Sequence, residues 1–393
     1  MKTSRRGFIA SATGCAAVSQ LRPSFSMEST TGGRNRHTDS LGELILEPDL
    51  PIIDPHHHLW SYPRATLPSM ITQMAEAPDI FTRGSVEMTR RHPRYLLEEF
   101  LHDTSSGHNI LATVYVETGQ MYKADGPPAM RSVGEVEFAN GIAAMSASGS
   151  FGPTRVCAGI VGGAPLAIGD AVQGVLEAHI QAGGGRYRGV RNSYNYDEDA
   201  TIFGPGGQPH GLLDPSFRSG FKWLRKLGLS FETYIVEPQL PDLTDLARAF
   251  PETQIVLDHL GAPIGVGRYT GKRQERFPIW QKNIRELAKC ENVIIKIGGL
   301  ETAVTGLKSW CASPPFSSAQ LAAEWRPYIE TAIEAFHANR CMFESDFPVD
   351  AEGCTYATLW NAFKRVVAQA SRDEKMQLFS GTAQRVYRLS LDS

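Results

Sequence analysis

Cysteine is scarce in this chain of 393 residues, and its six copies are scattered. No two of them form a C-x-x-C pair, so the spacing excludes a zinc ribbon and a dense disulfide framework. We expect the thiols to be buried and reduced, as free cysteines usually are. The six positions are Cys15, Cys157, Cys290, Cys311, Cys341 and Cys354.

The chain also lacks an excess of positive charge and a long apolar run. Lysine and arginine total 39 against 42 aspartates and glutamates, which gives a formal net charge of −3. A nucleic-acid-binding protein usually has a basic excess, so nucleic acid is not an expected partner. No run reaches the roughly 18 apolar residues that span a bilayer. We expect a globular protein that acts on a small molecule, with a homo-oligomer left open.

The first 43 residues are predicted to be an export signal and a linker. Lys2 and the pair Arg5-Arg6 make a basic start, and a weakly apolar stretch follows. The string Ser4-Arg5-Arg6-Gly7-Phe8-Ile9 resembles the twin-arginine signal of proteins that are exported already folded. Residues 22–43 are polar and typical of a linker. The sequence therefore predicts a periplasmic or otherwise exported protein, with a cytoplasmic enzyme as the alternative, and a catalytic domain over 44–393.

Eight short β-branched runs follow, separated by stretches with helical spacing. Most runs are continuously apolar, which is typical of parallel strands covered on both faces. Strand and helix in regular alternation predict an α/β protein with a (β/α)₈ TIM barrel, and a doubly wound sheet is the alternative. The runs are 52–58, 110–118, 156–163, 187–193, 229–236, 254–261, 293–300 and 341–348. The helical stretches are 95–102, 135–145, 171–182, 215–227, 242–250, 279–288, 319–338 and 356–369, and short closing helices are expected over 373–389.

Polar residues end several of these runs, where a barrel carries its active site. The first run ends in His56, His57 and His58. Residues two apart on a strand face the same way, so His56 and His58 are expected to face the barrel axis and His57 the helices. Two imidazoles so placed can hold a divalent cation or a substrate carboxylate.

The sixth and eighth runs add a histidine and carboxylates. The sixth ends in Asp258 and His259, one of which is expected to point inward. The eighth ends in Glu344, Ser345 and Asp346, and we expect Asp346 rather than Glu344 to be the inward carboxylate. Together with the first-run histidines, these residues predict a hydrolytic site in which Asp346 accepts a proton from water.

These segments resemble the amidohydrolase superfamily, and in particular its amidohydrolase-2 branch of TIM-barrel hydrolases, over about residues 50–390. The resemblance implies lactonase-like hydrolysis, with aromatic-acid decarboxylation as the known alternative within the branch. The segments are Ile53-Asp54-x-His56-x-His58-x-Trp60, Val114-Tyr115-Val116-Glu117, Arg186-Tyr187-Arg188-Gly189-Val190-Arg191, Val256-Leu257-Asp258-His259-Leu260-Gly261-x-Pro263, Phe343-Glu344-Ser345-Asp346-Phe347-Pro348 and Gly381-Thr382-Ala383-x-Arg385-Val386-Tyr387-Arg388-Leu389.

The resemblance also implies a set of metal ligands, with two departures. Glu237 stands where the branch often has a histidine at the fifth strand, and it is expected to serve as a ligand. Arg191, rather than a lysine, ends the fourth strand, so a two-metal site is not expected. One divalent ion, preferably zinc, is expected, although catalysis without a metal stays open. The expected ligands are His56, His58, Glu237, His259 and Asp346.

The remaining site predictions concern the substrate. His259, Asp346 and Arg191 are the expected catalytic residues, with Arg191 forked onto a carboxylate or lactone oxygen. Inserts at 63–87 and 204–213 are candidates for a lid. The expected substrate-binding residues are Trp60, Arg188, Asn192, Tyr194 and Lys296, the last also a possible buried partner of a carboxylate. The sequence thus predicts hydrolysis of a cyclic ester that bears carboxylate or hydroxyl groups. A non-catalytic binding barrel is the second alternative, after the decarboxylase.

Overall fold

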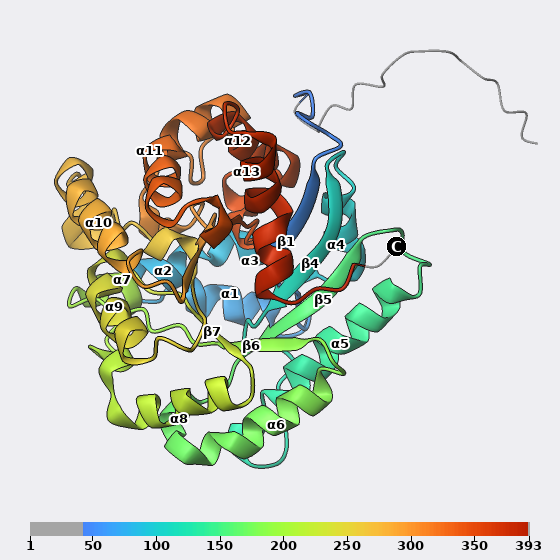
Figure 1. Cartoon of the computed structure of the whole chain (residues 1–393), viewed down its shortest axis with the longest axis vertical. Helices are drawn as coiled ribbons and strands as arrows, with labels where there is room; N and C mark the ends of the chain where they lie inside the picture. The colour runs from blue at the N-terminus through green and yellow to red at the C-terminus, as the bar shows by residue number, and fades with distance from the viewer. Residues whose placement is uncertain (1–41, 392–393) are drawn as a thin grey trace, which may run out of the picture. The chain divides into compact units, whose positions relative to one another are not determined.

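In the computed structural model, residues 42–391 are described, and eight of their strands form one parallel sheet. The sheet runs in the order β1-β4-β5-β6-β7-β8-β9-β10, and Figure 1 shows helices along its outer side. The strands are β1 (Pro51–His57), β4 (Asn109–Val116), β5 (Arg155–Gly162), β6 (Tyr187–Arg191), β7 (Ser230–Thr233), β8 (Ile255–Leu257), β9 (Val293–Ile297) and β10 (Cys341–Phe343). Each lies within one of the eight predicted runs or begins at most a residue or two outside it.

A helix follows every strand of the sheet, as the alternation predicted. Apolar residues on one face of each helix are buried against the strands. The order of strands and helices confirms the (β/α)₈ barrel and excludes the doubly wound alternative, whose strand order is not sequential. The helices are α4 (Leu97–Thr104), α5 (Val133–Ala147), α6 (Val172–Ala182), α8 (Pro215–Lys226), α9 (Leu240–Ala249), α10 (Arg273–Leu287), α11 (Ser318–Phe336) and α12 (Tyr356–Val366).

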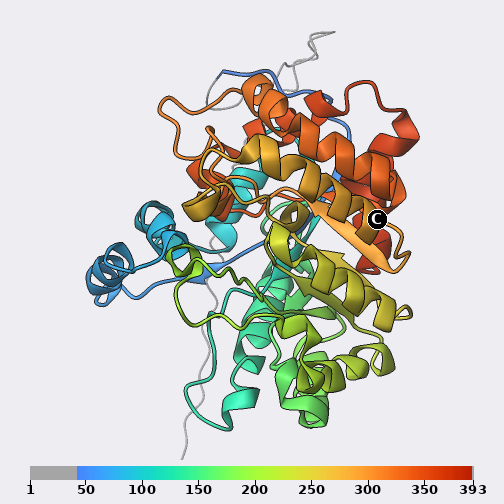
Figure 2. The same cartoon turned by 90° about the vertical axis from the view of Figure 1, so that its left-hand side faces the viewer.

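Additional elements lie at the two ends of the barrel. The long insert after β1 forms three helices, which protrude at the left of Figure 2, and a two-stranded ribbon flanks it. A short helix also follows β6. The C-terminal part forms the predicted closing helices, joined by a π-helical turn over Gln377–Gly381. These elements are β2 (Trp60–Ser61), α1 (Leu67–Ala75), α2 (Ile80–Gly84), α3 (Val86–Arg91), β3 (Arg94–Tyr95), α7 (Ala200–Phe203), α13 (Arg372–Met376) and α14 (Thr382–Val386).

The barrel closes between its first and last strands through few backbone bonds but several side-chain bonds. The N–H of His58 donates to the carbonyl of Phe347 at 2.8 Å, and the N–H of Asp346 donates to the carbonyl of His56 at 2.9 Å. Asp54 adds a second link, because it accepts from the hydroxyl of Ser345 at 2.6 Å. This seam joins the two chain segments that carry most of the predicted site.

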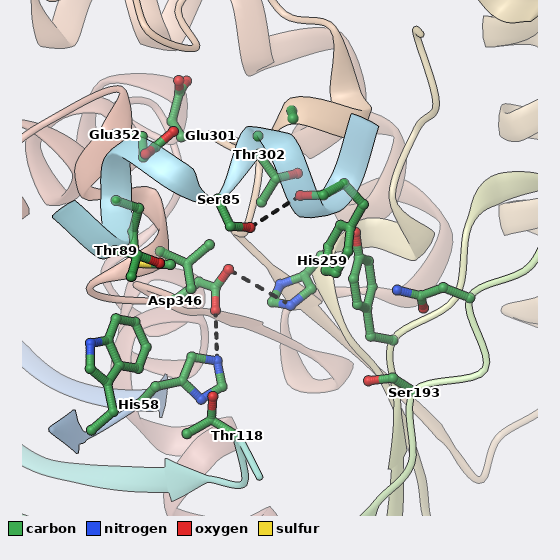
Figure 3. A pocket seen from close by; sticks show the side chains of 18 of the residues that line it. His58, Ser85, Thr89, Thr118, Ser193, His259, Glu301, Thr302, Asp346 and Glu352 are labelled. Carbon is green, nitrogen blue, oxygen red and sulfur yellow. Dashed lines mark hydrogen bonds and ion pairs between the residues drawn. The ribbon is translucent and has the colours of Figure 1, made fainter. Parts of the chain in front are cut away.

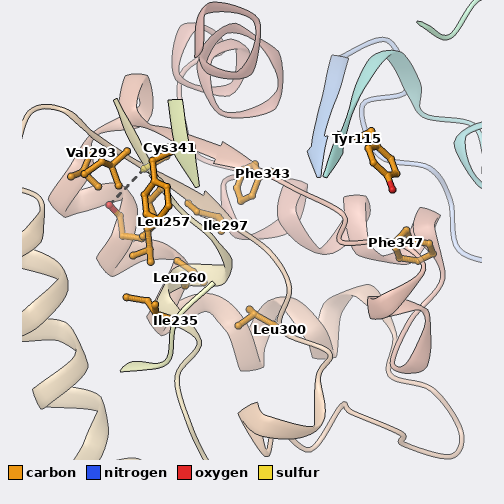
Figure 4. Close-up of a cluster of buried hydrophobic side chains, with 14 of the residues drawn as sticks. Tyr115, Ile235, Leu257, Leu260, Val293, Ile297, Leu300, Cys341, Phe343 and Phe347 are labelled. Carbon is orange, nitrogen blue, oxygen red and sulfur yellow. Dashed lines mark hydrogen bonds between the residues drawn. The ribbon is translucent and has the colours of Figure 1, made fainter. Parts of the chain in front are cut away.

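The strands have one apolar layer on the outside of the barrel and another inside it. Outward side chains such as Leu257, Ile297 and Phe343 are buried against the helices (Figure 4). Inward side chains from the first half of several strands, Val256 and Ile294 among them, cluster with Tyr387. The closing helices therefore plug the amino-terminal end of the barrel and leave the carboxyl-terminal end for the site.

A charged layer lies inside the barrel above that plug. The Nζ of Lys296 is 2.7 Å from Oε2 of Glu232 and 3.5 Å from Oδ1 of Asp258, and all three residues are fully buried. The hydroxyl of Tyr387 donates to Oε1 of Glu232 at 2.7 Å. Buried charges persist only when they are paired and hydrogen-bonded, so each member of this layer depends on the others.

The predictions about export, the cysteines and a membrane span have different outcomes. The export signal and most of the linker, with Cys15, lie outside, so export stays a prediction. The five described cysteines are free thiols, four buried as expected and Cys311 exposed. Within residues 42–391, none of the helices has the length and apolar character needed to cross a membrane.

The buried layer yields a stability prediction. Tyr387→Phe removes the donor to Glu232 without changing the ring, and it leaves a buried carboxylate oxygen without that bond. We expect the free energy of unfolding in urea to fall by about 1–3 kcal/mol. Tyr122→Phe, at a tyrosine that is 45% exposed, is the matched control and should change it by no more than about 0.5 kcal/mol. Equal losses in the two variants would contradict this account of the layer.

Candidate active site

The first strand places its three histidines as the alternation predicted. His56 and His58 face the interior, and their Nε2 atoms are 3.3 Å apart. His57 faces outward, where its ring stacks on Phe100 at 4.1 Å and its Nε2 lies 2.9 Å from the hydroxyl of Thr113. The pairing of β1 with β4 shifts register between Asp54 and His57, at the carboxyl end of the strand that carries the pair.

Asp346 lies between the histidines from the first and sixth predicted runs. Its Oδ1 is 3.2 Å from Nε2 of His58 and 3.5 Å from Nε2 of His56. Its Oδ2 is 3.9 Å from Nε2 of His259, and Figure 3 shows the carboxylate between His58 and His259. The structure therefore brings together four residues that are up to 290 positions apart in the sequence.

The far sides of the imidazoles are held by fixed oxygens. Glu344 serves two of them: Oε1 is 2.8 Å from Nδ1 of His259, and Oε2 is 2.7 Å from Nδ1 of His56. Nδ1 of His58 lies 2.9 Å from the carbonyl of Val116. An oxygen this close to a ring nitrogen favours the N–H form there, which assigns Nδ1 protons to His58 and His259. Nδ1 of His56 also lies 3.3 Å from Nζ of Lys296. Each ring directs Nε2 toward Asp346.

Backbone strain accompanies this convergence. His259 has φ 54° and Asp346 has φ 55°, both in the left-handed region that residues with a side chain seldom adopt. Gly299 lies beside His259, and a Cβ there would come within 1.9 Å of Nδ1 of the ring. Strained backbone of this kind clusters at functional sites, where the surroundings hold it in place.

The charges of the cluster shift its ionisation. Burial lowers the pKa of His259, but Glu344 and Asp346 outweigh burial and raise it to about 9. Burial raises the pKa of Asp346, but His259 and His58 outweigh burial and hold that pKa below its ordinary value. Asp346 is therefore a carboxylate at neutral pH.

The donor set fits a single divalent cation. Ligand atoms of His56, His259 and Asp346 all lie within 4.8 Å of one another. The Nε2 atoms of His56 and His58 face each other at 3.3 Å beside a carboxylate oxygen. Electron-rich atoms so close together repel each other unless a proton or a cation lies among them. Imidazole nitrogens with one carboxylate are the donors that zinc prefers.

A cavity of about 330 Å³ opens over this cluster. Its lower wall includes His58, His259 and Asp346, and we call it the catalytic cup. The insert after β1, predicted as a lid, supplies much of the opposite wall, whereas the insert at 204–213 supplies none of it. The apolar lining includes Trp60, Tyr62, Met74, Phe81, Met88, Tyr234 and Trp310.

Arg191 is the single arginine or lysine among the described residues that line the cup, and it is already paired. Its Nε donates to Oδ2 of Asp258 at 3.0 Å. Its Nη1 lies 3.4 Å from Oε1 of Glu117. The opposite wall includes two carboxyl residues, Glu301 and Glu352. The cup therefore offers no unpaired cationic side chain to an anionic substrate.

The structure does not bring Glu237 to the other expected ligands. Strand β7 ends at Thr233, and Glu237 begins a turn of 3₁₀ helix after it. There its Oε2 accepts from Nε of Arg276, on α10, at 3.0 Å. The expectation that Glu237 is a metal ligand is wrong in this geometry, because an arginine outside the barrel neutralises it.

Four expected substrate-binding residues also lie away from the cup, and only Trp60 lines it. Arg188 bonds to the backbone carbonyls of Gly185 and Tyr387. Tyr194 packs on Phe217 of α8, with 5.2 Å between ring centroids. Asn192 lines a neighbouring cavity instead. Lys296 lies in the buried charged layer, so only its alternative role as a buried carboxylate partner holds.

Two residues of the site were missed or ranked too low. Glu344 was the less favoured inward carboxylate, yet it holds two imidazoles. The signal was available, since residues 344 and 346 are two apart and so share a face, like 56 and 58. Tyr234 follows β7 directly and lines the cup, with its ring 5.1 Å from that of His259. Its position at a strand end was the signal for it.

The cup wall yields a pH prediction. Burial raises the pKa of Glu301 to about 8, so the folded protein holds a proton there that the unfolded chain has released above about pH 4.5. Stability should therefore fall as pH rises from 4.5 to 8, with up to about 1.4 kcal/mol per pH unit from this group. Glu301→Gln should flatten that slope in urea unfolding across this range. Glu252→Gln, at a side chain that is 78% exposed, is the control, and an unchanged slope in Glu301→Gln would contradict the prediction.

Comparison with known proteins places this geometry in a family. Residues 154–389 match the sequence model of the amidohydrolase family. The uncharacterized protein y4mH of Sinorhizobium fredii is 32% identical over 344 residues, which is 87% of this chain and 99% of that protein. The L-fucono-1,5-lactonase of Burkholderia multivorans is 27% identical over 207 residues, 52% of this chain, and the match spans 64% of the lactonase.

Solved structures agree on the fold. A crystal structure of an amidohydrolase from Burkholderia multivorans with bound zinc superposes with a TM-score of 0.61 and 24% identity, covering 86% of this chain and 99% of that one. At 24% identity, this structural similarity shows only that the two proteins share the barrel fold. The family match over more than half of the sequence, together with a 32% identical relative of nearly full coverage, shows that this chain belongs to the amidohydrolase family.

Proposed function

We propose that this chain is a lactonase that hydrolyses an uncharged lactone. The observation that carries the proposal is the convergence of three oriented imidazoles and one carboxylate at the floor of an apolar cup. The family supports a hydrolase or lyase in general. The match to an L-fucono-1,5-lactonase supports a sugar lactone in particular.

Asp346 is placed to act as the general base. It is a carboxylate at neutral pH and lines the cup. In the proposed step it takes a proton from a water molecule, and the oxygen of that water adds to the lactone carbonyl carbon. The ring acyl–oxygen bond then breaks, and the proton returns to the leaving alkoxide. The product is an open-chain hydroxy acid.

The role of the histidines in the proposed reaction is to help polarise the lactone carbonyl. His56, His58 and His259, with Asp346, would hold a divalent ion, which supplies Lewis-acid polarisation of a carbonyl when bound. The donor chemistry and the zinc bound by the Burkholderia multivorans amidohydrolase support zinc as that ion. Glu344 keeps His56 and His259 oriented, and this removes the need to reorganise them during the reaction.

The electrostatics of the cup favour an uncharged substrate over a carboxylated one. Arg191 was expected to bind a substrate carboxylate, but its charge is already matched by Asp258 and Glu117. A substrate anion would have to displace one of these buried or half-buried partners and leave it unpaired, at a cost of several kcal/mol. Glu301 and Glu352 on the opposite wall add no attraction.

Removal of the general base tests the reaction. Asp346→Asn keeps the size of the side chain but cannot accept a proton from water, so kcat for lactone hydrolysis should fall by about 10²–10⁴-fold. Asp245→Asn is the matched control: it makes the same change on α9 at a side chain that is 61% exposed and does not line the cup, so kcat should stay at the wild-type value. Circular dichroism should show both variants folded. Full activity in Asp346→Asn would refute the role.

Labelled water separates hydrolysis from decarboxylation, the alternative within the same family. A lactonase must place one oxygen-18 atom in the product carboxylate, since water supplies that oxygen. A decarboxylase instead releases carbon dioxide and adds no label to its organic product. Mass spectrometry of the products distinguishes these reactions, and a chain that turns over neither class of substrate would support the non-catalytic alternative.

A substrate pair tests the charge argument. Gluconolactone and its carboxylated analogue, glucarolactone, differ chiefly in one anionic group. We expect kcat/KM to be at least about tenfold higher for the uncharged lactone, equivalent to 1.4 kcal/mol. Arg191 supplies the reason, since its guanidinium is not free. A preference for the anionic lactone would contradict the proposal that the substrate is uncharged.

A further inference from the structure

A second cavity adjoins the catalytic cup. It has a volume of about 640 Å³ and lies at the carboxyl-terminal ends of β4, β5 and β6. Arg191 and Ser193 line both cavities, so the two hollows share a wall. We call the second hollow the side cavity. A ligand that occupies both hollows would lie across Arg191 and Ser193.

Exposed apolar side chains gather at the side cavity. Tyr122 and Ile168 line it and are 45% and 42% exposed. Met121, next to Tyr122 in the chain, is 40% exposed. Large apolar side chains left in solvent beside a hollow mark a surface that is covered in use. Tyr122 also provides a flat ring of the kind on which an apolar face of a ligand can rest.

Among the described residues, the polar lining includes hydrogen-bond acceptors, and its one cation, Arg191, is paired. Glu117 presents a carboxylate that is 16% exposed, and Arg191 is engaged with it. Oδ1 of Asn192 is buried without a hydrogen-bond partner, while its Nδ2 donates to the carbonyl of Ala164 at 3.0 Å. Ser193 adds a hydroxyl. Acceptors beside apolar side chains suit a ligand with many hydroxyl donors, no charge and one apolar face, which describes a sugar ring.

Gly163 keeps part of this cavity open. A Cβ at this position would lie 3.2 Å from the hydroxyl of Tyr122 and 3.4 Å from Oε2 of Glu117. The backbone there is ordinary, because Gly163 is not among the glycines with positive φ. The absence of a side chain is therefore a matter of space rather than of backbone conformation, and a larger residue would extend into the cavity beside both polar groups.

We infer that the side cavity binds a sugar residue joined to the lactone, so that the preferred substrate is the aldonolactone of a disaccharide. The inference rests on the proposed lactonase function. Water adds to the carbonyl and the ring acyl–oxygen bond breaks, as proposed above, while the glycosidic bond stays intact. The lactone ring occupies the cup and the second ring occupies the side cavity.

The experiment compares cellobionolactone with gluconolactone. The wild-type protein should have the higher kcat/KM for cellobionolactone. Tyr122→Ala, which removes the ring platform, and Gly163→Val, which fills the cavity, should raise KM for cellobionolactone about tenfold and leave kcat and all values for gluconolactone unchanged. A tenfold loss corresponds to about 1.4 kcal/mol.

Matched controls separate this effect from general damage. Ile279→Ala changes a residue on α10 that is 42% exposed, and Gly174→Val adds the same side chain where a Cβ meets no neighbouring atom. Neither should alter either substrate. Equal losses for both lactones in Tyr122→Ala and Gly163→Val would overturn the inference, and so would a wild-type preference for gluconolactone.

Product binding keeps the inference testable if the lactonase proposal fails. Isothermal titration of the metal-loaded protein with cellobionate and with gluconate needs no turnover. Tighter binding of cellobionate, lost in Gly163→Val but kept in Gly174→Val, would support the side cavity even in a chain that hydrolyses neither lactone. Equal binding of the two acids, or an affinity for cellobionate that is unchanged in Gly163→Val, would overturn it.

Discussion

The site depends on one buried carboxylate that is shared by two imidazoles. Glu344 lies within 2.8 Å of Nδ1 of both His56 and His259, and it also accepts from the backbone N–H of His259 at 3.1 Å. This one side chain contacts two rings that come from opposite parts of the sequence and helps to fix their orientation. Without Glu344, no contact with a carboxylate on the far side of the rings would hold Nε2 of His56 and His259 toward Asp346.

The seam of the barrel supplies the second constraint. The last strand meets the first through hydrogen bonds that also fix Asp346 and His58. The same bonds therefore close the barrel and hold the site together. Asp54, on the outer side, holds Ser345 and leaves its neighbours Glu344 and Asp346 facing inward. The left-handed backbone of Asp346 is tolerated because these contacts surround it on both sides.

Much of this arrangement was predictable because the carboxyl ends of parallel strands meet at one end of a barrel. That rule placed His56, His58, His259 and Asp346 together from strand ends alone. The family resemblance misplaced Glu237, since the sequence does not reveal that β7 stops four residues earlier and that Arg276 approaches from a helix. It also did not identify Asp258 as a partner of Arg191. Such pairings depend on neighbouring strands and on helices whose exact register is set only in three dimensions.

Because charges inside the barrel are paired with one another, the barrel can carry the reaction while the insert after β1 carries substrate selectivity. Lys296 and Arg191 could each have drawn an anion, but Glu232, Asp258 and Glu117 match them below and beside the site. The barrel thus presents a local set of donors to a carbonyl and little net charge to the rest of a substrate. Selectivity must then come from shape and apolar contact, which the insert after β1 and the loops around the side cavity supply. Loops can change without disturbing the buried pairs, so a single barrel of this kind can keep its reaction while its substrate changes.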